Sequence, residues 1–177
     1  MSLETEVGPI ANKPQLEKVL RYIEIAKKEG NKCLIGGSAL TEGKLGKGYF
    51  VAPTIFDNVK PENTLAQEEV FGPVLAVFRV GDFEEAMTVA NNVQFGLTCS
   101  IYTGDANLVM RFTDRIEAGM VHINSPTVGG EAQLPFGGFK STGYGSREMS
   151  DEGLNFFTQL KTVFYDYTGV KRQTNIY

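Results

Sequence analysis

Short β-prone runs alternate with amphipathic helical segments along most of this sequence, and the alternation limits the fold more than any other feature. From Pro14 to Glu29 apolar residues recur with a period near 3.6, and Gly30 follows. Asp82 and Asp105 are placed to cap two further helices. The helices are expected over Pro14–Glu29, Phe83–Asn91, from Asp105 to Arg115 and Glu152–Phe157, and the strands over Cys33–Ile35, Tyr49–Val59, Val74–Val80, Leu97–Tyr102, Met120–Asn124 and Leu160–Tyr167. This order predicts an α/β fold with a largely parallel sheet and flanking helices.

The charge and composition exclude several classes of partner. The formal net charge of −4 argues against nucleic acid and against an anionic membrane surface as a partner. No apolar run approaches the roughly 20 residues of a membrane-spanning helix. The two cysteines, Cys33 and Cys99, lie far apart, which is typical of a reducing compartment, although two cysteines are enough for one bridge. We therefore expect a cytoplasmic protein.

An acidic segment with an adjacent aromatic residue is the first candidate site. Gln67 to Pro73 combines the carboxylates of Glu68 and Glu69 with the ring of Phe71 and a Gly-Pro turn. A carboxylate near a loop can accept hydrogen bonds from both hydroxyls of a ribose, and the aromatic ring can pack against a flat ligand. The same residues also suit an exposed acidic turn before a strand.

A glycine-rich stretch from Ser125 to Gly145 is the second candidate site. It shows neither helical nor strand periodicity, and loops of this length in compact domains are usually functional or disordered. Its apolar residues, Leu134, Phe136 and Phe139, favour an ordered functional loop. The glycine spacing around Lys140 matches no phosphate-binding loop. A glycine-rich crossover that only packs on the core is the alternative.

The single histidine and the two cysteines are weak candidates for chemistry. His122 lies in an apolar strand, where a structural role is expected, and one histidine makes a zinc site improbable. Cys33 and Cys99 lie in apolar runs, without the cation or helix amino terminus that activates a thiol. We expect both cysteines to be packing residues.

Six segments in sequence order resemble motifs of the aldehyde dehydrogenase superfamily. Glu68–Val74 matches the E-E-x-F-G-P-V motif and Pro135–Lys140 matches P-F-G-G-x-K. The other matching segments are Val7–Ile10, Gly48–Ile55, Asn92–Leu97 and Gly119–Asn124. Each match is weak by itself, but six in one order indicate the later part of the family's catalytic domain, followed by an oligomerisation strand.

The resemblance implies roles for individual residues. Glu69 would bind the nicotinamide ribose of NAD or NADP, and Phe71 would pack beside the nicotinamide. The aldehyde tunnel would be lined by Asn124, Ser125, Pro126, Thr127, Val128 and Phe136. We expect Glu69 and Phe71 to stand across a shared cleft from the stretch around Phe136. The sequence from Asn124 to Gln133 is similar to that of enzymes acting on small acid semialdehydes, such as α-ketoglutarate semialdehyde.

The resemblance also predicts what the chain lacks. The family's nucleophilic cysteine, general base, oxyanion donor and dinucleotide-binding domain would all precede Glu4. Residues 1–3 are interpreted as an expression scar, 4–159 as a partial catalytic domain, and 160–177 as an oligomerisation strand and tail. The chain alone is therefore expected to be inactive, with no useful affinity for NAD, and to form homo-oligomers through exposed apolar surface and an unpaired strand edge. A binding or assembly module on the same scaffold, and an unrelated α/β enzyme using Cys33 or Cys99, are the alternatives.

Overall fold

The computed structural model describes residues 5–167 and 169–170. The expected scar at residues 1–3 and the end of the tail, 171–177, lie outside the described residues. The helices are α1 (Lys13–Lys28), α2 (Thr64–Gln67), α3 (Phe83–Asn91), α4 (Ala106–Arg115) and α5 (Ser150–Phe157), with a 3-10 turn at Leu45–Lys47. The strands are β1 (Lys32–Ile35), β2 (Thr54–Asp57), β3 (Val74–Ala76), β4 (Phe95–Gly96), β5 (Thr98–Ile101), β6 (Met120–Ile123) and β7 (Phe139–Lys140).

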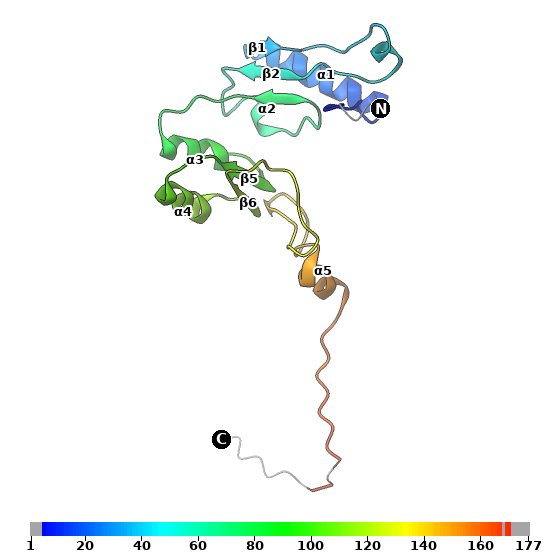
Figure 1. The fold of residues 1–177 in the computed structure, drawn as a ribbon, viewed down its shortest axis with the longest axis vertical. Coiled ribbons are helices and arrows are strands. Elements are labelled where there is room, and N and C mark those ends of the chain that lie inside the picture. Colours follow the sequence, from blue (N-terminus) through cyan, green and yellow to red (C-terminus); the bar gives the residue numbers. More distant parts are fainter. Residues whose placement is uncertain (1–4, 168, 171–177) are drawn as a thin grey trace.

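The α/β class is confirmed, with the strands divided among three small sheets. The first has the order β1-β2-β3, in which β1 is antiparallel and β3 parallel to β2. The second is the antiparallel pair β4-β7, and the third is the parallel pair β5-β6. Figure 1 shows the first sheet with α1 at one end of the molecule, and β5 and β6 with α3 and α4 next to it.

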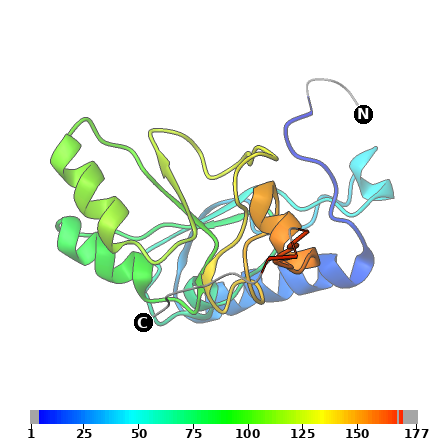
Figure 2. The ribbon, with the colours of Figure 1, turned by 90° about the horizontal axis from the view of Figure 1, so that it is seen from below.

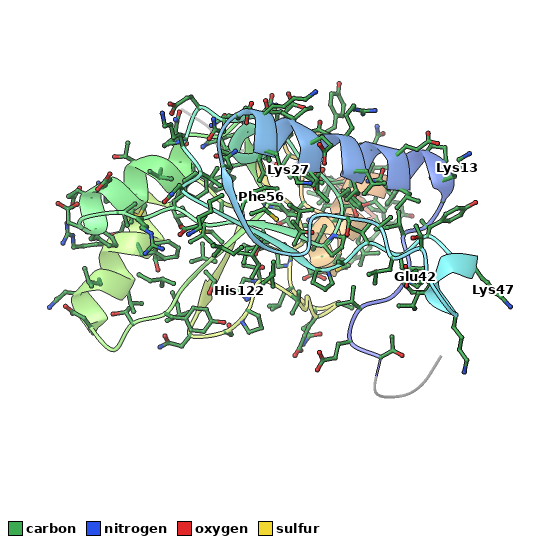
Figure 3. All side chains as sticks on the ribbon, turned by 90° about the horizontal axis from the view of Figure 1, so that it is seen from above. Lys13, Lys27, Glu42, Lys47, Phe56 and His122 are labelled. Atoms are coloured by element: carbon green, nitrogen blue, oxygen red, sulfur yellow. The ribbon has the colours of Figure 1, made fainter. Side chains whose placement is uncertain are left out.

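Helix α1 covers the first sheet because its apolar stripe faces the strands. Asn12 caps the helix, its side chain accepting a hydrogen bond from the Gln15 N–H at 2.9 Å. Val19 and Ile23 are fully buried and belong to the same cluster as Phe56 of β2. Figure 3 shows Phe56 next to α1, whose two ends are marked by Lys13 and Lys27. Burial of this stripe provides the main hydrophobic stabilisation of the first layer.

A second core lies under α3 and α4, the two helices that pack side by side at one end of the molecule in Figure 2. Met87 of α3 and Phe112 of α4 are buried, together with Ile116 and Ala118. Cys99 of β5 and Val121 of β6 pack against this cluster. The segment between β3 and α3 links the two cores. The acidic loop packs on the first core, and the glycine-rich segment is attached to the elements around the second.

Several elements differ in extent from the sequence prediction. The strand expected over Val74–Val80 ends at Ala76, and its pairing with β2 covers only Thr54, Ile55 and Phe56. The stretch 125–145, expected to lack regular structure, contains β7. No secondary structure is assigned to Leu160–Tyr167, and the chain after α5 leaves the body of the molecule in Figure 1. Its expected role in subunit contact stays a prediction, because a strand at an interface needs a second chain to pair with.

Candidate functional site

The acidic loop between α2 and β3 is held close to α1. A Cβ on Gly72 would lie 2.5 Å from Cγ2 of Val19, so only glycine permits this approach of the loop to the helix. Val70 is 8% exposed and belongs to the first core. Phe71, the next residue, has φ +58°, a left-handed conformation that is strained for an aromatic residue. Phe71 is 71% exposed, so its ring does not contribute to the core and is available to contact another group.

The two carboxylates of this loop have different surroundings. Glu68 accepts a hydrogen bond from the Tyr22 hydroxyl at 2.5 Å. Within the part of the chain that the structure describes, no hydrogen bond or ion pair engages the carboxylate of Glu69. Both residues line the same cavity, and Glu69 is the one whose two carboxylate oxygens are both without a partner among the described residues.

The glycine-rich segment is fastened to the second layer by its charged side chains. The Lys140 ammonium donates to the backbone oxygens of Asn91 at 2.6 Å and Val93 at 3.1 Å, just after α3, and forms an ion pair with Glu117 at 2.6 Å. Arg147 donates to the Gly138 oxygen at 2.5 Å. A cation at the carboxyl end of a helix is favourable, because the terminal carbonyls carry partial negative charge. Lys140 therefore fixes where this segment crosses the end of α3.

Close backbone contacts complete this attachment. A Cβ on Gly119 would lie 2.0 Å from the Gly137 oxygen, so the segment passes directly over the start of β6. The Thr142 hydroxyl accepts a hydrogen bond from the Gly96 N–H at 2.8 Å. The short sheet β4-β7, with Gly96 opposite Phe139, holds the middle of the segment. The segment is thus ordered by contacts with residues about 20 to 50 positions earlier in the chain.

A cavity of about 580 Å³ lies between the acidic loop and the end of the glycine-rich segment. Glu68 and Glu69 line one side, and Ser141, Thr142 and Gly143 line another. The expected shared cleft is therefore present for Glu69 and the end of the glycine-rich segment. Phe71 and Phe136 are not among the residues that line it.

Phe136 lines two smaller cavities, of about 220 and 230 Å³. The first shares Leu97, Thr142 and Gly143 with the larger cavity, and the second also touches His122, Gly129 and Gly130. Residues 124–128 are not among the residues lining any of these three cavities. Phe136 and the 124–128 stretch do not line one cavity together in the described structure, so the expected aldehyde tunnel stays a prediction.

The stretch from Asn124 to Val128 follows β6 and is anchored at its start. The Asn124 amide bonds both ways to the backbone of Thr103, accepting from its N–H at 2.8 Å and donating to its oxygen at 3.0 Å. The Ser125 oxygen accepts a hydrogen bond from the Ser100 hydroxyl at 2.6 Å. Pro126, Thr127 and Val128 are exposed. Asn124 therefore acts in this chain as a brace between two loops.

Cys33 and Cys99 pack against the two cores, and His122 lies within β6. Burial raises the pKa of the Cys99 thiol, which lines the larger cavity and packs on the second core. Cys33 donates a weak hydrogen bond to the Ile35 oxygen at 3.3 Å. Among the described residues, no group of three or more His, Cys, Asp and Glu side chains is arranged to hold a metal ion. Within that same part of the chain, no helix is long and apolar enough to span a membrane.

Some residues that shape the site escaped the sequence interpretation. Gln15, Lys18 and Tyr22 of α1 hold the acidic loop, and Lys140 and Arg147 hold the glycine-rich segment. The signal for the first three was their spacing of three and four residues, which places polar groups on one face of the helix. Nothing local identified their partners, which lie about 50 residues away.

The family of the chain follows from comparison with known proteins. Residues 1–163 match the model of the aldehyde dehydrogenase family, and the chain belongs to this family. This finding confirms the resemblance seen in the motifs, and it removes the alternative of an unrelated α/β enzyme.

Particular relatives narrow the comparison. The chain is 50% identical over 165 residues to an α-ketoglutaric semialdehyde dehydrogenase of Bacillus subtilis, a match covering 92% of the chain and 34% of that protein. An α-ketoglutarate semialdehyde dehydrogenase of Haloferax volcanii is 47% identical, with 92% and 34% covered. The NAD⁺ complex of an aldehyde dehydrogenase from Bacillus cereus superposes with a TM-score of 0.86 and 39% identity, covering 94% of this chain and 33% of that one. The chain thus spans about a third of the length of the curated relatives it matches.

Proposed function

We propose that the chain supplies the cofactor-ribose contact and part of the substrate contact of an NAD(P)-dependent aldehyde dehydrogenase. Glu69 accepts hydrogen bonds from the nicotinamide ribose hydroxyls, and Phe71 packs beside the nicotinamide. The observation that carries this proposal is the Glu69 carboxylate, which has no partner among the described residues and lines a cavity opposite Ser141–Gly143. The exposed, left-handed Phe71 two residues later supports the second contact.

The reaction we propose for the whole enzyme oxidises an aldehyde to a carboxylic acid. A cysteine thiolate attacks the aldehyde carbon, the hydride from that carbon passes to NAD(P)⁺, and water then hydrolyses the thioester and regenerates the thiol. Neither thiol of this chain fits the role of nucleophile, since Cys99 is held protonated by burial and Cys33 lies in β1. We therefore propose that the nucleophile is supplied from outside these 177 residues. The chain alone is then inactive.

The substrate we propose is a small acid semialdehyde of the α-ketoglutarate semialdehyde type. Two relatives with this substrate in their names are 50% and 47% identical to the chain. In this proposal Asn124, Ser125, Pro126, Thr127, Val128 and Phe136 line the aldehyde tunnel. Since Phe136 and the 124–128 stretch line no common cavity in this chain, we propose that contacts with the rest of the enzyme complete the tunnel.

The enzyme is proposed to act as a cytoplasmic homo-oligomer. Two free cysteines suit a reducing compartment. Large apolar side chains of the 160–167 segment are strongly exposed, among them Leu160 at 97% and Phe164 at 90%. Surfaces of this kind are usually covered by a partner.

A chimera tests the proposed function directly. The corresponding third of the Bacillus subtilis relative is replaced by this chain, and NADH formation is measured with α-ketoglutarate semialdehyde. We expect the chimera to be active, and Glu69→Gln to lower kcat/KM roughly 10- to 100-fold, as expected for a lost hydrogen bond to a charged group. Glu62→Gln, at an exposed carboxylate outside the cavity, is the matched control and should have no effect. A folded chimera that forms no NADH, or in which both variants behave alike, would contradict the proposal.

The isolated chain provides the complementary test. It should form no NADH above background with aldehyde and added cofactor, because it supplies no activated thiol. Iodoacetamide at neutral pH should label Cys99 slowly, since only the thiolate reacts. Aldehyde-dependent turnover abolished by Cys99→Ser or Cys33→Ser would show that the chain carries its own nucleophile.

A further inference from the structure

One face of α1 forms a row of donors directed at the acidic loop. Gln15, Lys18 and Tyr22 are three and four residues apart and therefore share a face of the helix. Gln15 donates its amide N–H groups to the backbone oxygens of Val70 and Phe71, both at 3.0 Å. The backbone at Phe71 is left-handed and outside any helix or strand. The two bonds from Gln15 therefore satisfy carbonyls that have no partner in regular secondary structure.

The two other donors of this row bond to different parts of the adjacent glutamates, one to a backbone oxygen and one to a carboxylate. Lys18 donates to the backbone oxygen of Glu69 at 2.9 Å and does not bond its carboxylate. Tyr22 donates to the side chain of Glu68 at 2.5 Å. The Tyr22 ring is only 9% exposed and belongs to the first core, so packing fixes the position of its hydroxyl. Of two successive carboxylates at the same cavity, one is engaged and the other is left with free oxygens.

We infer that Tyr22 is a positioning residue, which holds one oxygen of Glu68 and so leaves Glu69 as the carboxylate of the loop with both oxygens available to a ribose diol. The inference rests on the proposed role of Glu69 in cofactor binding. A diol is recognised well when one carboxylate in a fixed position accepts from both hydroxyls, and a second mobile carboxylate beside it would compete for the same hydroxyls. Restraining Glu68 reduces this competition.

The chemistry of the pair suits this role. The hydrogen bond to Glu68 raises the pKa of Tyr22 above its ordinary value of 10.0, with burial adding to the effect. The hydroxyl thus remains a donor throughout the neutral range. Because Glu68 is itself exposed, the aromatic hydroxyl is what restrains its carboxylate within the described structure.

Carboxyl labelling reads out which glutamate is free. The whole chain is treated with a water-soluble carbodiimide and glycinamide without cofactor, and labelling of Glu68 and Glu69 is measured by peptide mass spectrometry. In the wild type we expect Glu69 to be labelled several-fold faster than Glu68. Tyr22→Phe keeps the buried ring and should accelerate labelling of Glu68 roughly tenfold, the factor typical of one hydrogen bond to a charged group, with Glu69 unchanged within about twofold.

Controls separate this role from general stabilisation. Tyr102→Phe removes the hydroxyl of a tyrosine that is 66% exposed, and it should leave both labelling rates unchanged. A merely structural role for Tyr22 predicts that Tyr22→Phe accelerates labelling at both glutamates, and this result would overturn the inference. Equal labelling of Glu68 and Glu69 in the wild type would overturn it as well. Since no cofactor is present, the result is independent of the chimera experiment, which alone decides whether Glu69 binds ribose.

Discussion

At the scale of the residue, Asp57 at the end of β2 gives the chain a pH-dependent contact. It accepts a hydrogen bond from Arg79 at 2.7 Å, and this bond holds the pKa of the Asp57 carboxyl below its ordinary value of 3.8. A carboxyl whose pKa is lower in the folded than in the unfolded chain stabilises the fold above its unfolded pKa. That contribution is lost as the pH falls below about 3.8 through the lower, folded pKa.

Asp57→Asn should therefore lower the free energy of unfolding at neutral pH. The difference from wild type should narrow in acid below the ordinary carboxyl pKa, where the wild-type side chain becomes neutral too. Urea denaturation at a series of pH values measures both quantities. Asp114→Asn, at an exposed carboxylate that makes no hydrogen bond or ion pair within the described residues, should show no comparable loss. A constant difference down to strongly acidic pH would count against the ion pair as the cause.

At the scale of the element, α3 is set by its amino-terminal cap. The Asp82 carboxylate accepts a hydrogen bond from the Glu85 N–H at 2.9 Å, and the Glu85 carboxylate accepts one from the Gly81 N–H at 2.6 Å. This is a capping box displaced by one residue, because the returning bond reaches Gly81 and not Asp82. The cap fixes the start of the helix whose carboxyl end Lys140 then holds.

Asp82→Ala should destabilise the chain by about 1 kcal/mol, the usual cost of losing a capping side chain. Asp82→Asn should retain most of the stability, since its amide oxygen can still accept from Glu85. Thermal unfolding followed by circular dichroism compares the three proteins. Equal destabilisation by both substitutions would mean that the charge near the helix terminus, rather than the cap bond, matters.

At the scale of the whole molecule, the chain after α5 presents apolar side chains to solvent. Leu160, Phe164 and Tyr165 are 97%, 90% and 81% exposed, respectively. Exposed apolar residues of this size favour association. Residues 160–167 form no helix or strand within the chain, so their backbone is available for strand pairing between copies.

The chain should consequently form a dimer or larger oligomer at tens of micromolar, and truncation after Gln159 should shift it toward monomer. Light scattering coupled to size-exclusion chromatography measures the mass of both proteins. The substitution Phe164→Ser offers a milder disruption of the same segment. A monomeric full-length chain under these conditions would refute the prediction.

Local chemistry made many elements predictable from sequence. The helices over Phe83–Asn91 and up to Arg115 were predicted because Asp82 and Asp105 act on amides within three residues of themselves. The acidic loop and the glycine-rich segment were recognisable as motifs for the same reason, since each is contiguous in the chain. The prediction was wrong where pairing with a distant strand set the limits, as in β3, which pairs with β2 over only three residues.

The sequence by itself thus determined the boundaries of α3 and α4, the α/β class and the family, because these depend on neighbouring residues and on short motifs. Only the tertiary structure decided that Glu69 and Thr142 line one cavity, and that Phe136 meets Thr142 at a neighbouring, smaller cavity instead. It alone decided that Tyr22 engages Glu68, because that bond joins residues 46 positions apart. The reason is physical: a periodicity or a cap acts within a few residues, whereas a shared cavity depends on how distant segments pack.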